Sequence, residues 1–291
     1  MIHLIKFKII SYFRSFKNYY SKKPKILNTI ETIDDLINNK VSVTRFGDGE
    51  FDLILNNRSL AFQKSDILLR EKLIEILKSN ERNVYVCIPY SLISTFNMNK
   101  KAAFFWNLYF NRNYQKLMPY FNFKTVYGDS LFTRLYMDYK DKTDSPQLFN
   151  KLFEVWTNQD ILIIEGEESK LGVGNDIFEG TKSLKRILCP SVNAFGKYNE
   201  ILEKIIELAK KENLILISLG PTATATALAK LGYWAIDIGH VDIEYEWMKI
   251  GASDKIGIQN RKVWEVNHIT QVEISDDESY QNSIIYKIYP S

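Results

Sequence analysis

The residues with the clearest capacity for chemistry lie in one short stretch, Arg45-Phe46-Gly47-Asp48-Gly49-Glu50. Two glycines flank Asp48 and allow the chain to turn sharply after an apolar run. On such a turn the carboxylates of Asp48 and Glu50 can converge, and they repel each other unless a cation or a proton lies between them. A hard divalent ion, Mn²⁺ or Mg²⁺, with substrate phosphates in its shell would satisfy both, and the guanidinium of Arg45 suits phosphate oxygens. The alternative is an ordinary acidic surface turn, which is common for an isolated Asp-x-Glu.

A second group of ionisable side chains lies near residue 240. The run Asp237–Trp247 carries His240, Asp242 and Glu244 at alternate positions, which in extended geometry would share one face. Several acids on one face favour a bound cation or a protonated member. One of the three would then be the general base that takes a proton from an acceptor hydroxyl, with Glu244 or Asp242 preferred to His240. The alternative is an acidic, solvated strand or helix start in which His240 binds a backbone carbonyl.

The elements that position these residues follow an alternation of strands and helices. Runs typical of buried parallel strands occur at 41–44, 84–88, 161–164, 186–189, 214–218 and 234–238. Helical segments are predicted at 66–79, 198–211 and 223–231. This alternation predicts parallel βαβ units with right-handed crossovers. Ligands of such sheets bind beyond the carboxyl ends of the strands, where the segments 45–50, 166–174, 220–224 and 239–246 all fall.

Two glycine-containing segments after predicted strands are candidates for binding phosphate. The segment 165–176 contains Lys170 among several glycines, and a strand followed by such a turn is typical of phosphate loops. It lacks the Gly-Lys-Ser/Thr of a P-loop. The second segment, Gly220–Thr222, precedes a predicted helix. We expect the backbone amides of Gly172–Gly174 or of Gly220–Thr222 to hold phosphates together with Arg45.

The composition is that of a globular domain. The 291 residues are 45% hydrophobic, which is enough for one large core. A net charge of +3 is too small to indicate nucleic-acid binding, and no apolar run reaches the roughly 20 residues of a membrane span. Cys87 and Cys189 lie in apolar runs without disulfide or zinc spacing. We therefore expect two buried thiols and a cytoplasmic protein.

The N-terminal segment differs from the rest because its first 30 residues contain no acid. Apolar and aromatic residues recur there at spacings of three or four among several lysines. We expect a basic amphipathic helix over residues 1–27, followed by a single domain over residues 28–291. Residues 1–25 of such a helix can contact the inner face of an anionic membrane. The alternative is a helix that packs on its own domain with a solvated basic face.

The segment 100–121 is dense in aromatic residues, including Phe104, Phe105, Trp106 and Tyr109. It predicts a helix with apolar side chains on much of its circumference. Core packing is the preferred interpretation. The alternative is a platform for a sugar or another acceptor, because flat aromatic faces pack against the C–H faces of sugars.

Several of these segments together resemble the GT-D type glycosyltransferases, a bacterial family formerly classed as a domain of unknown function. Its members occur in clusters that glycosylate serine-rich surface adhesins or build surface polysaccharides. The resemblance extends over about residues 30 to 265. It is carried by Arg45–Glu50, Gly172-Val173-Gly174-Asn175-Asp176, Asn193-Ala194-Phe195, Gly220-Pro221-Thr222 and Gly239–Trp247.

The resemblance implies a Rossmann-like α/β fold with a mainly parallel sheet flanked by helices, distinct from the other glycosyltransferase folds. It also implies a nucleotide-sugar donor, typically UDP-glucose, and a divalent ion, usually Mn²⁺, bound by an Asp-x-Glu motif that Asp48 and Glu50 match. The expected function is metal-dependent transfer of a hexose, taken as glucose, from a UDP-sugar to a hydroxyl of a glycan on a protein or lipid carrier. The residues expected to bind the donor are Arg45, Gly47, Lys170, Gly172, Gly174, Asn175, Asn193, Gly220 and Thr222.

Two other functions compete with this interpretation. A Rossmann-type methyltransferase is suggested by Ser218-Leu219-Gly220 followed by Asp237, but Gly-x-Gly-x-x-Gly is absent and Pro221 stands in the loop. A non-catalytic nucleotide-sugar-binding subunit is the other alternative. The paired carboxylates argue against it, because a binding protein needs no doubly acidic turn.

Overall fold

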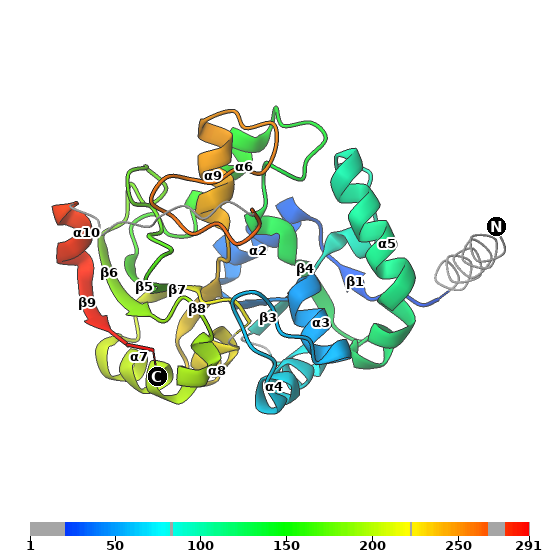
Figure 1. The fold of residues 1–291 in the computed structure, drawn as a ribbon, viewed down its shortest axis with the longest axis horizontal. Coiled ribbons are helices and arrows are strands. Elements are labelled where there is room, and N and C mark those ends of the chain that lie inside the picture. Colours follow the sequence, from blue (N-terminus) through cyan, green and yellow to red (C-terminus); the bar gives the residue numbers. More distant parts are fainter. Residues whose placement is uncertain (1–20, 82–83, 222, 267–276, 291) are drawn as a thin grey trace.

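The computed structural model describes residues 21–81, 84–221, 223–266 and 277–290. Within them, a nine-stranded sheet lies at the centre with helices on both faces (Figure 1). All strand pairs are parallel, in the order β1-β4-β3-β2-β8-β7-β5-β6-β9. The predicted Rossmann-like α/β fold is therefore confirmed. The strands are β1 (Lys25–Ile26), β2 (Ser42–Arg45), β3 (Val84–Ile88), β4 (Val126–Asp129), β5 (Asp160–Gly166), β6 (Ser183–Cys189), β7 (Leu214–Ser218), β8 (Trp234–Asp237) and β9 (Ile284–Lys287).

The helices divide between the two faces of the sheet (Figure 1). Helices α2 and α6 cover one face, and α9 packs against α6, whereas α4, α7 and α8 cover the other face. Helix α5 packs on α3 near the β4 side, and α10 lies beside β9 at the opposite edge. The helices are α2 (Thr29–Asn39), α3 (Asp48–Asn56), α4 (Ile67–Lys78), α5 (Lys100–Leu117), α6 (Ser145–Phe153), α7 (Tyr198–Leu208), α8 (Thr224–Lys230), α9 (Val241–Lys249) and α10 (Glu278–Ser283).

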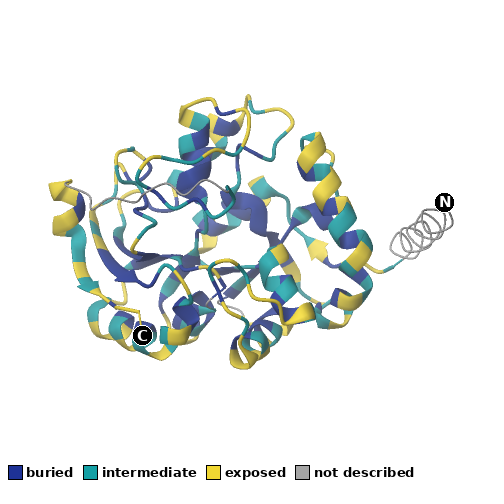
Figure 2. Ribbon diagram, viewed as in Figure 1, coloured by how far each residue is buried: buried dark blue, intermediate teal, exposed yellow. Residues whose placement is uncertain are grey.

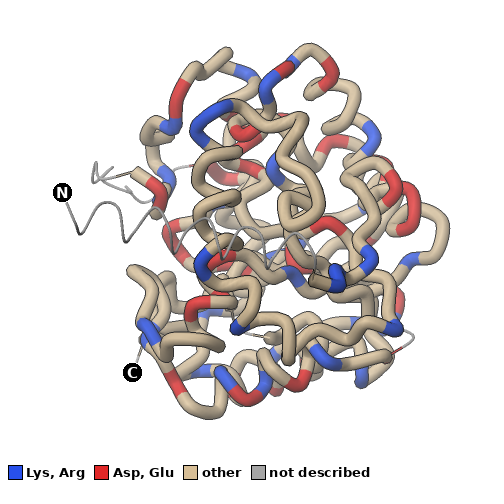
Figure 3. Tube along the Cα trace, turned by 90° about the vertical axis from the view of Figure 1, so that its right-hand side faces the viewer, with Lys and Arg blue, Asp and Glu red and all other residues tan. Residues whose placement is uncertain are grey.

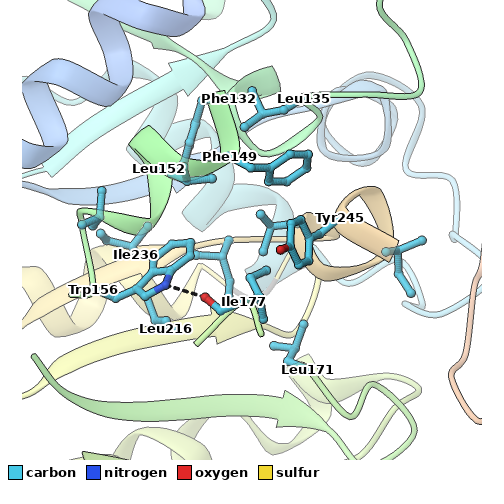
Figure 4. Packing of buried hydrophobic residues seen from close by; sticks show 14 of the residues in the cluster. Phe132, Leu135, Phe149, Leu152, Trp156, Leu171, Ile177, Leu216, Ile236 and Tyr245 are labelled. Carbon is cyan, nitrogen blue, oxygen red and sulfur yellow. Dashed lines mark hydrogen bonds between the residues drawn. The ribbon is translucent and has the colours of Figure 1, made fainter. Parts of the chain in front are cut away.

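Each buried strand contributes side chains to two cores, because successive residues of a strand point to opposite faces. Ile161 and Ile163 of β5 belong to the cluster under α2 and α6, whereas Leu162 and Ile164 belong to the cluster under α7. The central strands are accordingly mostly buried, whereas the edge strands β1 and β9 are partly exposed (Figure 2). In the first cluster Trp156 also donates a hydrogen bond from Nε1 to the carbonyl of Ile177, 2.8 Å away (Figure 4). Strands covered on both faces explain the continuous apolar runs of the sequence.

Most elements agree with the sequence predictions, with differences at the termini. The apolar runs form β2, β3, β5, β6, β7 and β8, and the aromatic segment forms α5. Cys87 and Cys189 are free and buried, as predicted. The predicted basic helix lies mostly outside the described residues. Its expected end is a strand instead, since Lys25–Ile26 pair with β4, so the sheet begins before residue 28.

No helix among the described residues combines the length and the apolar character needed to cross a bilayer. Acidic and basic residues are interspersed over the side of the molecule seen in Figure 3. The functional site therefore has to be recognised from its buried charges rather than from a surface of one sign.

One buried ion pair fixes the loop that follows β5. Arg186 NH1 lies 2.6 Å from Glu165 Oε1, and both side chains are almost completely buried. Arg186 also donates to the carbonyl of Leu171, while Glu165 Oε2 accepts from the amide of Leu171. The pair thus stabilises the start of the loop as well as the sheet.

We predict that Arg186→Met lowers the free energy of unfolding by about 3–5 kcal/mol, because it leaves the Glu165 carboxylate buried without its partner. The double variant Glu165→Leu/Arg186→Met should recover most of this loss, since no lone charge remains. Urea denaturation of the three proteins measures both effects. A single variant within 1 kcal/mol of the wild type would contradict this account of the pair.

Candidate active site

Two helices begin side by side at the carboxyl edge of the sheet. Strand β2 leads into α3 and its neighbour β8 leads into α9, with Val43 opposite Ile236 in the register between the strands. Both helix N-termini contribute to one cavity of about 1120 Å³. The cavity is also lined by Gly166, Gly220 and their neighbours, so the four strand-end segments expected from the sequence do converge.

The acidic pair occupies the first turn of helix α3. The tight turn predicted from the two glycines is therefore wrong. Residues two apart on a helix do not face each other, so the two carboxylates do not converge by local geometry. Glu50 reaches back to accept a hydrogen bond from the amide of Gly47 at 2.7 Å. The side chain of Asp48 remains exposed at the cavity. Desolvation at the cavity raises the pKa of Glu50 to about 7 and also raises that of Asp48, although the Asp48 side chain keeps contact with solvent.

The Arg45 side chain is held beside this turn by a backbone carbonyl and a carboxylate. Its Nε donates to the carbonyl of Ser130 at 2.9 Å, and its NH1 lies 3.7 Å from Asp237 Oδ1. NH1 has no hydrogen-bond partner among the described residues. Gly239, with a φ of +46°, packs so closely that a Cβ built there would lie 1.9 Å from this nitrogen. A side chain at position 239 would therefore have to displace the Arg45 guanidinium.

The acidic run near residue 240 is helix α9, so its side chains do not share the single face expected from extended geometry. Because residues four positions apart lie on the same side of a helix, the acidic side chains and His240 divide between two faces of α9. Asp242 and Glu246 both bind Arg261, with Asp242 Oδ2 2.6 Å from NH1. Asp242 is fully buried and also accepts from the amide of Gly172. It therefore fastens the loop that follows β5 to α9.

The other face of α9 carries His240 and Glu244. Glu244 is fully buried, and its Oε2 accepts from the amides of Tyr136 and Met137 at 3.2 and 2.8 Å. Its Oε1 lies 3.6 Å from Arg134 NH1 but lacks a hydrogen bond to the described residues. Burial raises the pKa of Glu244 to about 7. His240 is the member of the run with a partly exposed ring that lines the cavity.

A carboxylate from a distant loop orients the His240 ring. Glu265 Oε1 lies 3.1 Å from His240 Nδ1 and 2.5 Å from Arg134 NH2. Arg134 NH2 also lies 3.4 Å from Nδ1, but the shorter contact with the carboxylate favours a proton on Nδ1, which leaves Nε2 as an acceptor. Burial would raise the pKa of Glu265, but Arg134, His240 and Lys255 hold it well below its usual range. Glu265 is therefore an anion that fixes the tautomer of His240.

The loop after β5 is farther from this centre than the sequence suggested. Lys170 is buried, and Lys170, Gly172, Gly174 and Asn175 are absent from the residues that line the cavity. The amide of Gly172 and the side chain of Asn175 both donate to Asp242. The loop reaches the cavity instead through Gly166, Glu168, Ser169 and Leu171.

The other predicted donor-binding residues follow three different strands, with Gly47 after β2, Asn193 after β6 and Gly220 after β7. Gly47 and Gly220 line the cavity, whereas Asn193 stands behind its wall. Asn193 donates from its amide to the carbonyl of Phe62 at 2.7 Å, and its side chain accepts from Gln63. Gly220 has a φ of +62°, and a Cβ there would lie 2.6 Å from the Phe62 ring. Thr222 lies outside the described residues.

Sequence reasoning missed the residues supplied by irregular segments. Arg261, Trp264 and Glu265 come from the loop after α9, and Phe62 comes from the loop after α3. The rings of Phe62 and Trp264 approach to 5.7 Å between centroids, so these two loops touch beside the cavity. The one available signal was the mixture of charged and aromatic residues at 261–265, in a segment without helix or strand periodicity.

The acidic groups of the site allow a divalent ion that is shared with a ligand. Within the described residues, no group of three or more His, Cys, Asp and Glu side chains is arranged to hold a metal by protein atoms alone. Mg²⁺ and similar ions are commonly bound by one or two carboxylates with substrate phosphates completing the shell. Asp48 and Glu50, two hard oxygen donors that line the cavity at the start of α3, fit that mode.

Comparison with known proteins places this site in a family. The family described as "Glycosyltransferase GT-D fold" matches residues 43–266. Glycosyltransferase GlyD of Streptococcus pneumoniae serotype 4 is 36% identical over 265 residues, which cover 89% of this chain and 32% of the relative. The probable glycosyl transferase Gly of Streptococcus gordonii is 38% identical over 266 residues, covering 89% and 38%. The chain thus spans about a third of the length of these curated relatives.

Solved structures agree with the sequence matches. A structure described as the highly conserved domain of unknown function 1792, with a distinct glycosyltransferase fold, superposes with a TM-score of 0.89 at 35% identity. The match covers 96% of this chain and all of that chain. A structure described as a new glycosyltransferase from Streptococcus sanguinis gives a TM-score of 0.86 at 37% identity, covering 92% of this chain and 100% of the other. The resemblance found in the sequence is confirmed.

The packing of Gly239 against Arg45 yields a prediction with a matched control. Gly251, with a φ of +64°, has open space where a Cβ would stand. Gly251→Ala should therefore cost only the backbone strain of a left-handed residue, about 1–2 kcal/mol. Gly239→Ala should cost clearly more, because it must also displace the Arg45 guanidinium. Denaturant titration measures the difference, and equal losses in the two variants would contradict the assigned contact.

Proposed function

This chain belongs to the family of glycosyltransferases with the GT-D fold, and we propose that it transfers glucose from UDP-glucose to a hydroxyl of a glycan carried by a protein or a lipid. The observation that supports this proposal most strongly is the convergence of two helix N-termini, Arg45 and the Asp48/Glu50 pair on one cavity. These groups together suit a diphosphate that arrives with a metal ion.

The diphosphate of the donor would lie between the N-termini of α3 and α9. Unpaired amides and the dipole of a helix N-terminus favour an anion. Arg45 lines the cavity and adds a cation whose charge favours the same anion. Gly220 and the residues after β5 would extend this site along the sheet edge.

Asp48 and Glu50 are the residues that would hold Mn²⁺ or Mg²⁺. When bound, the ion neutralises negative charge that grows on the departing UDP. Glu50 already accepts the amide of Gly47 with one oxygen, so its position is fixed by the helix it caps. Asp48 lies two residues earlier, at the first position of α3, and its carboxylate is exposed to the cavity.

His240 is the residue of the α9 run that we assign to the acceptor. Glu265 keeps the proton on Nδ1, so Nε2 can accept the proton of an acceptor hydroxyl. The acceptor oxygen forms a bond to the anomeric carbon while the bond from that carbon to the diphosphate oxygen breaks, and the electron pair leaves with UDP. Asp242 and Glu244 would support this centre from behind, because both are buried and engaged by other groups.

The metal assignment predicts that Asp48→Asn lowers Mn²⁺-dependent hydrolysis of UDP-glucose by 100-fold or more, since an ion at this position contributes on the order of several kcal/mol to the barrier. The fold should be retained. Asp52→Asn is the matched control, because Asp52 lies on the same helix and binds Tyr109 outside the cavity lining. Hydrolysis in Asp48→Asn at the wild-type rate would refute the assignment.

The proposed role of His240 predicts an effect on kcat that can be distinguished from an effect on donor binding. His240→Ala should reduce kcat for transfer by about 10²–10⁴-fold, as expected on loss of a general base, with little change in the KM for the donor. Glu265→Gln should give a smaller reduction in kcat, because the ring is retained but its tautomer is no longer fixed. Steady-state kinetics with saturating acceptor measures both variants. A defect confined to the KM for UDP-glucose would contradict this role and would indicate that His240 binds the donor instead of the acceptor.

A further inference from the structure

The wall of the cavity beside Asp48 is formed by α5 and exposes an aromatic ring. Phe105 and Trp106 both line the cavity, and Phe105 is 44% exposed although it is a large apolar residue. Phe110 and Tyr114 of the same helix are buried in the core below α3 and α4, whereas Phe104 is exposed. Phe105 therefore presents a flat face to the cavity that core packing does not use.

The Phe105 ring is fixed by its neighbours and, through them, to the acidic turn. It packs edge-on against Trp106 at 5.2 Å and stacks near Tyr109 at 6.1 Å. The hydroxyl of Tyr109 donates to Asp52 Oδ1 at 3.0 Å and lies 3.2 Å from the carbonyl of Asp48. A ligand on the Phe105 face would thus be held at a constant position relative to the helix that carries Asp48.

Charged groups border this aromatic face. Lys101 and Asp254 line the cavity and form an ion pair of 3.0 Å that joins α5 to the loop after α9. Their side chains are 82% and 66% exposed, and ion pairs this exposed contribute little to stability. A ligand hydroxyl can therefore hydrogen-bond to either group at little cost. A ring face with exposed charged groups at its edge suits a saccharide better than a lipid chain, which has no hydrogen-bonding groups.

The opposite side of the cavity is where the donor would lie. Arg45, Gly220 and the N-terminus of α9 lie at the ends of β2, β7 and β8, whereas the start of α3 also touches α5, since the Asp48 carbonyl lies 3.2 Å from the Tyr109 hydroxyl. The total volume of about 1120 Å³ also exceeds the roughly 300–1,000 Å³ of a typical single-ligand site. The cavity lining extends from these strand ends to α5, where a second ligand would lie beside the donor.

We propose that Phe105 and the Lys101–Asp254 pair form the binding site for the acceptor saccharide, with the C–H face of one sugar ring stacked on Phe105 and its hydroxyls bonded to the pair. This inference rests on the proposed transferase function. It adds to that function a defined acceptor subsite on α5, separate from the residues that bind the donor.

The test compares Phe105→Ala with Phe104→Ala. Phe104 is the adjacent residue, is 70% exposed and does not line the cavity, so it controls for the loss of a surface phenylalanine. Isothermal titration with cellobiose, maltose, lactose and N-acetyllactosamine, in the presence of UDP and Mn²⁺, measures saccharide affinity. We expect the wild type to bind at least one of them, Phe105→Ala to bind it about tenfold more weakly, and Phe104→Ala to bind it within twofold of the wild type.

A second variant distinguishes loss of the aromatic face from loss of folding. Phe105→Leu keeps the apolar volume but removes the flat face, so it should fold normally and also lose affinity. UDP affinity should be equal in all four proteins, which separates this proposal from the donor site. The proposal is overturned if Phe105→Leu binds the saccharide as the wild type does, if the variants lose UDP affinity instead, or if the wild type binds none of the four saccharides. Failure of the wild type to bind UDP would instead contradict the proposed function.

Discussion

The site depends on the pairing of β2 with β8, two strands that are distant in the sequence. The pairing is secured at its start, where the Ser42 hydroxyl donates to the carbonyl of Tyr233 and accepts from the amide of Ala235. It ends with Arg45 beside Asp237. Since each strand leads directly into a helix, this one pairing places the N-termini of α3 and α9 together. Every charged group that we assign to the chemistry lies on, or is oriented by, these two helix starts.

Around this junction, buried ionic groups divide into those that hold loops and those that face the cavity. Arg261 joins Asp242 and Glu246 and also donates to the carbonyl of Val173, so it links three segments without facing substrate. Removing either partner of such a pair would leave a lone charge in a low dielectric. Asp48 and His240 differ because each keeps an exposed part at the cavity. The buried ion pairs hold the loops in place, so Asp48 and His240 can remain accessible at the cavity until a ligand binds.

The fold and the location of the site could be predicted from the sequence, because continuous apolar runs identify buried parallel strands and such sheets bind ligands at their carboxyl edge. The local conformation of the two acidic segments could not be predicted in the same way. Asp48-Gly49-Glu50 has the glycine of a turn, yet it starts a helix because Glu50 caps the amide of Gly47. The alternation at His240, Asp242 and Glu244 imitates a strand inside α9. The partners Arg134, Arg261 and Glu265 were not predicted as a network, because pairing across more than a hundred residues, as between Arg134 and Glu265, leaves no local signal.

The central claim is that the two helix starts bind one nucleotide diphosphate with a metal ion beside Asp48. The most direct measurement is a crystal structure of the protein with UDP and Mn²⁺, with anomalous scattering data collected to locate the manganese. The account predicts a manganese peak with Asp48 or Glu50 oxygen atoms in its shell, and the diphosphate between the N-termini of α3 and α9 within reach of Arg45. A diphosphate bound elsewhere, or a manganese ion that contacts neither carboxylate, would contradict it.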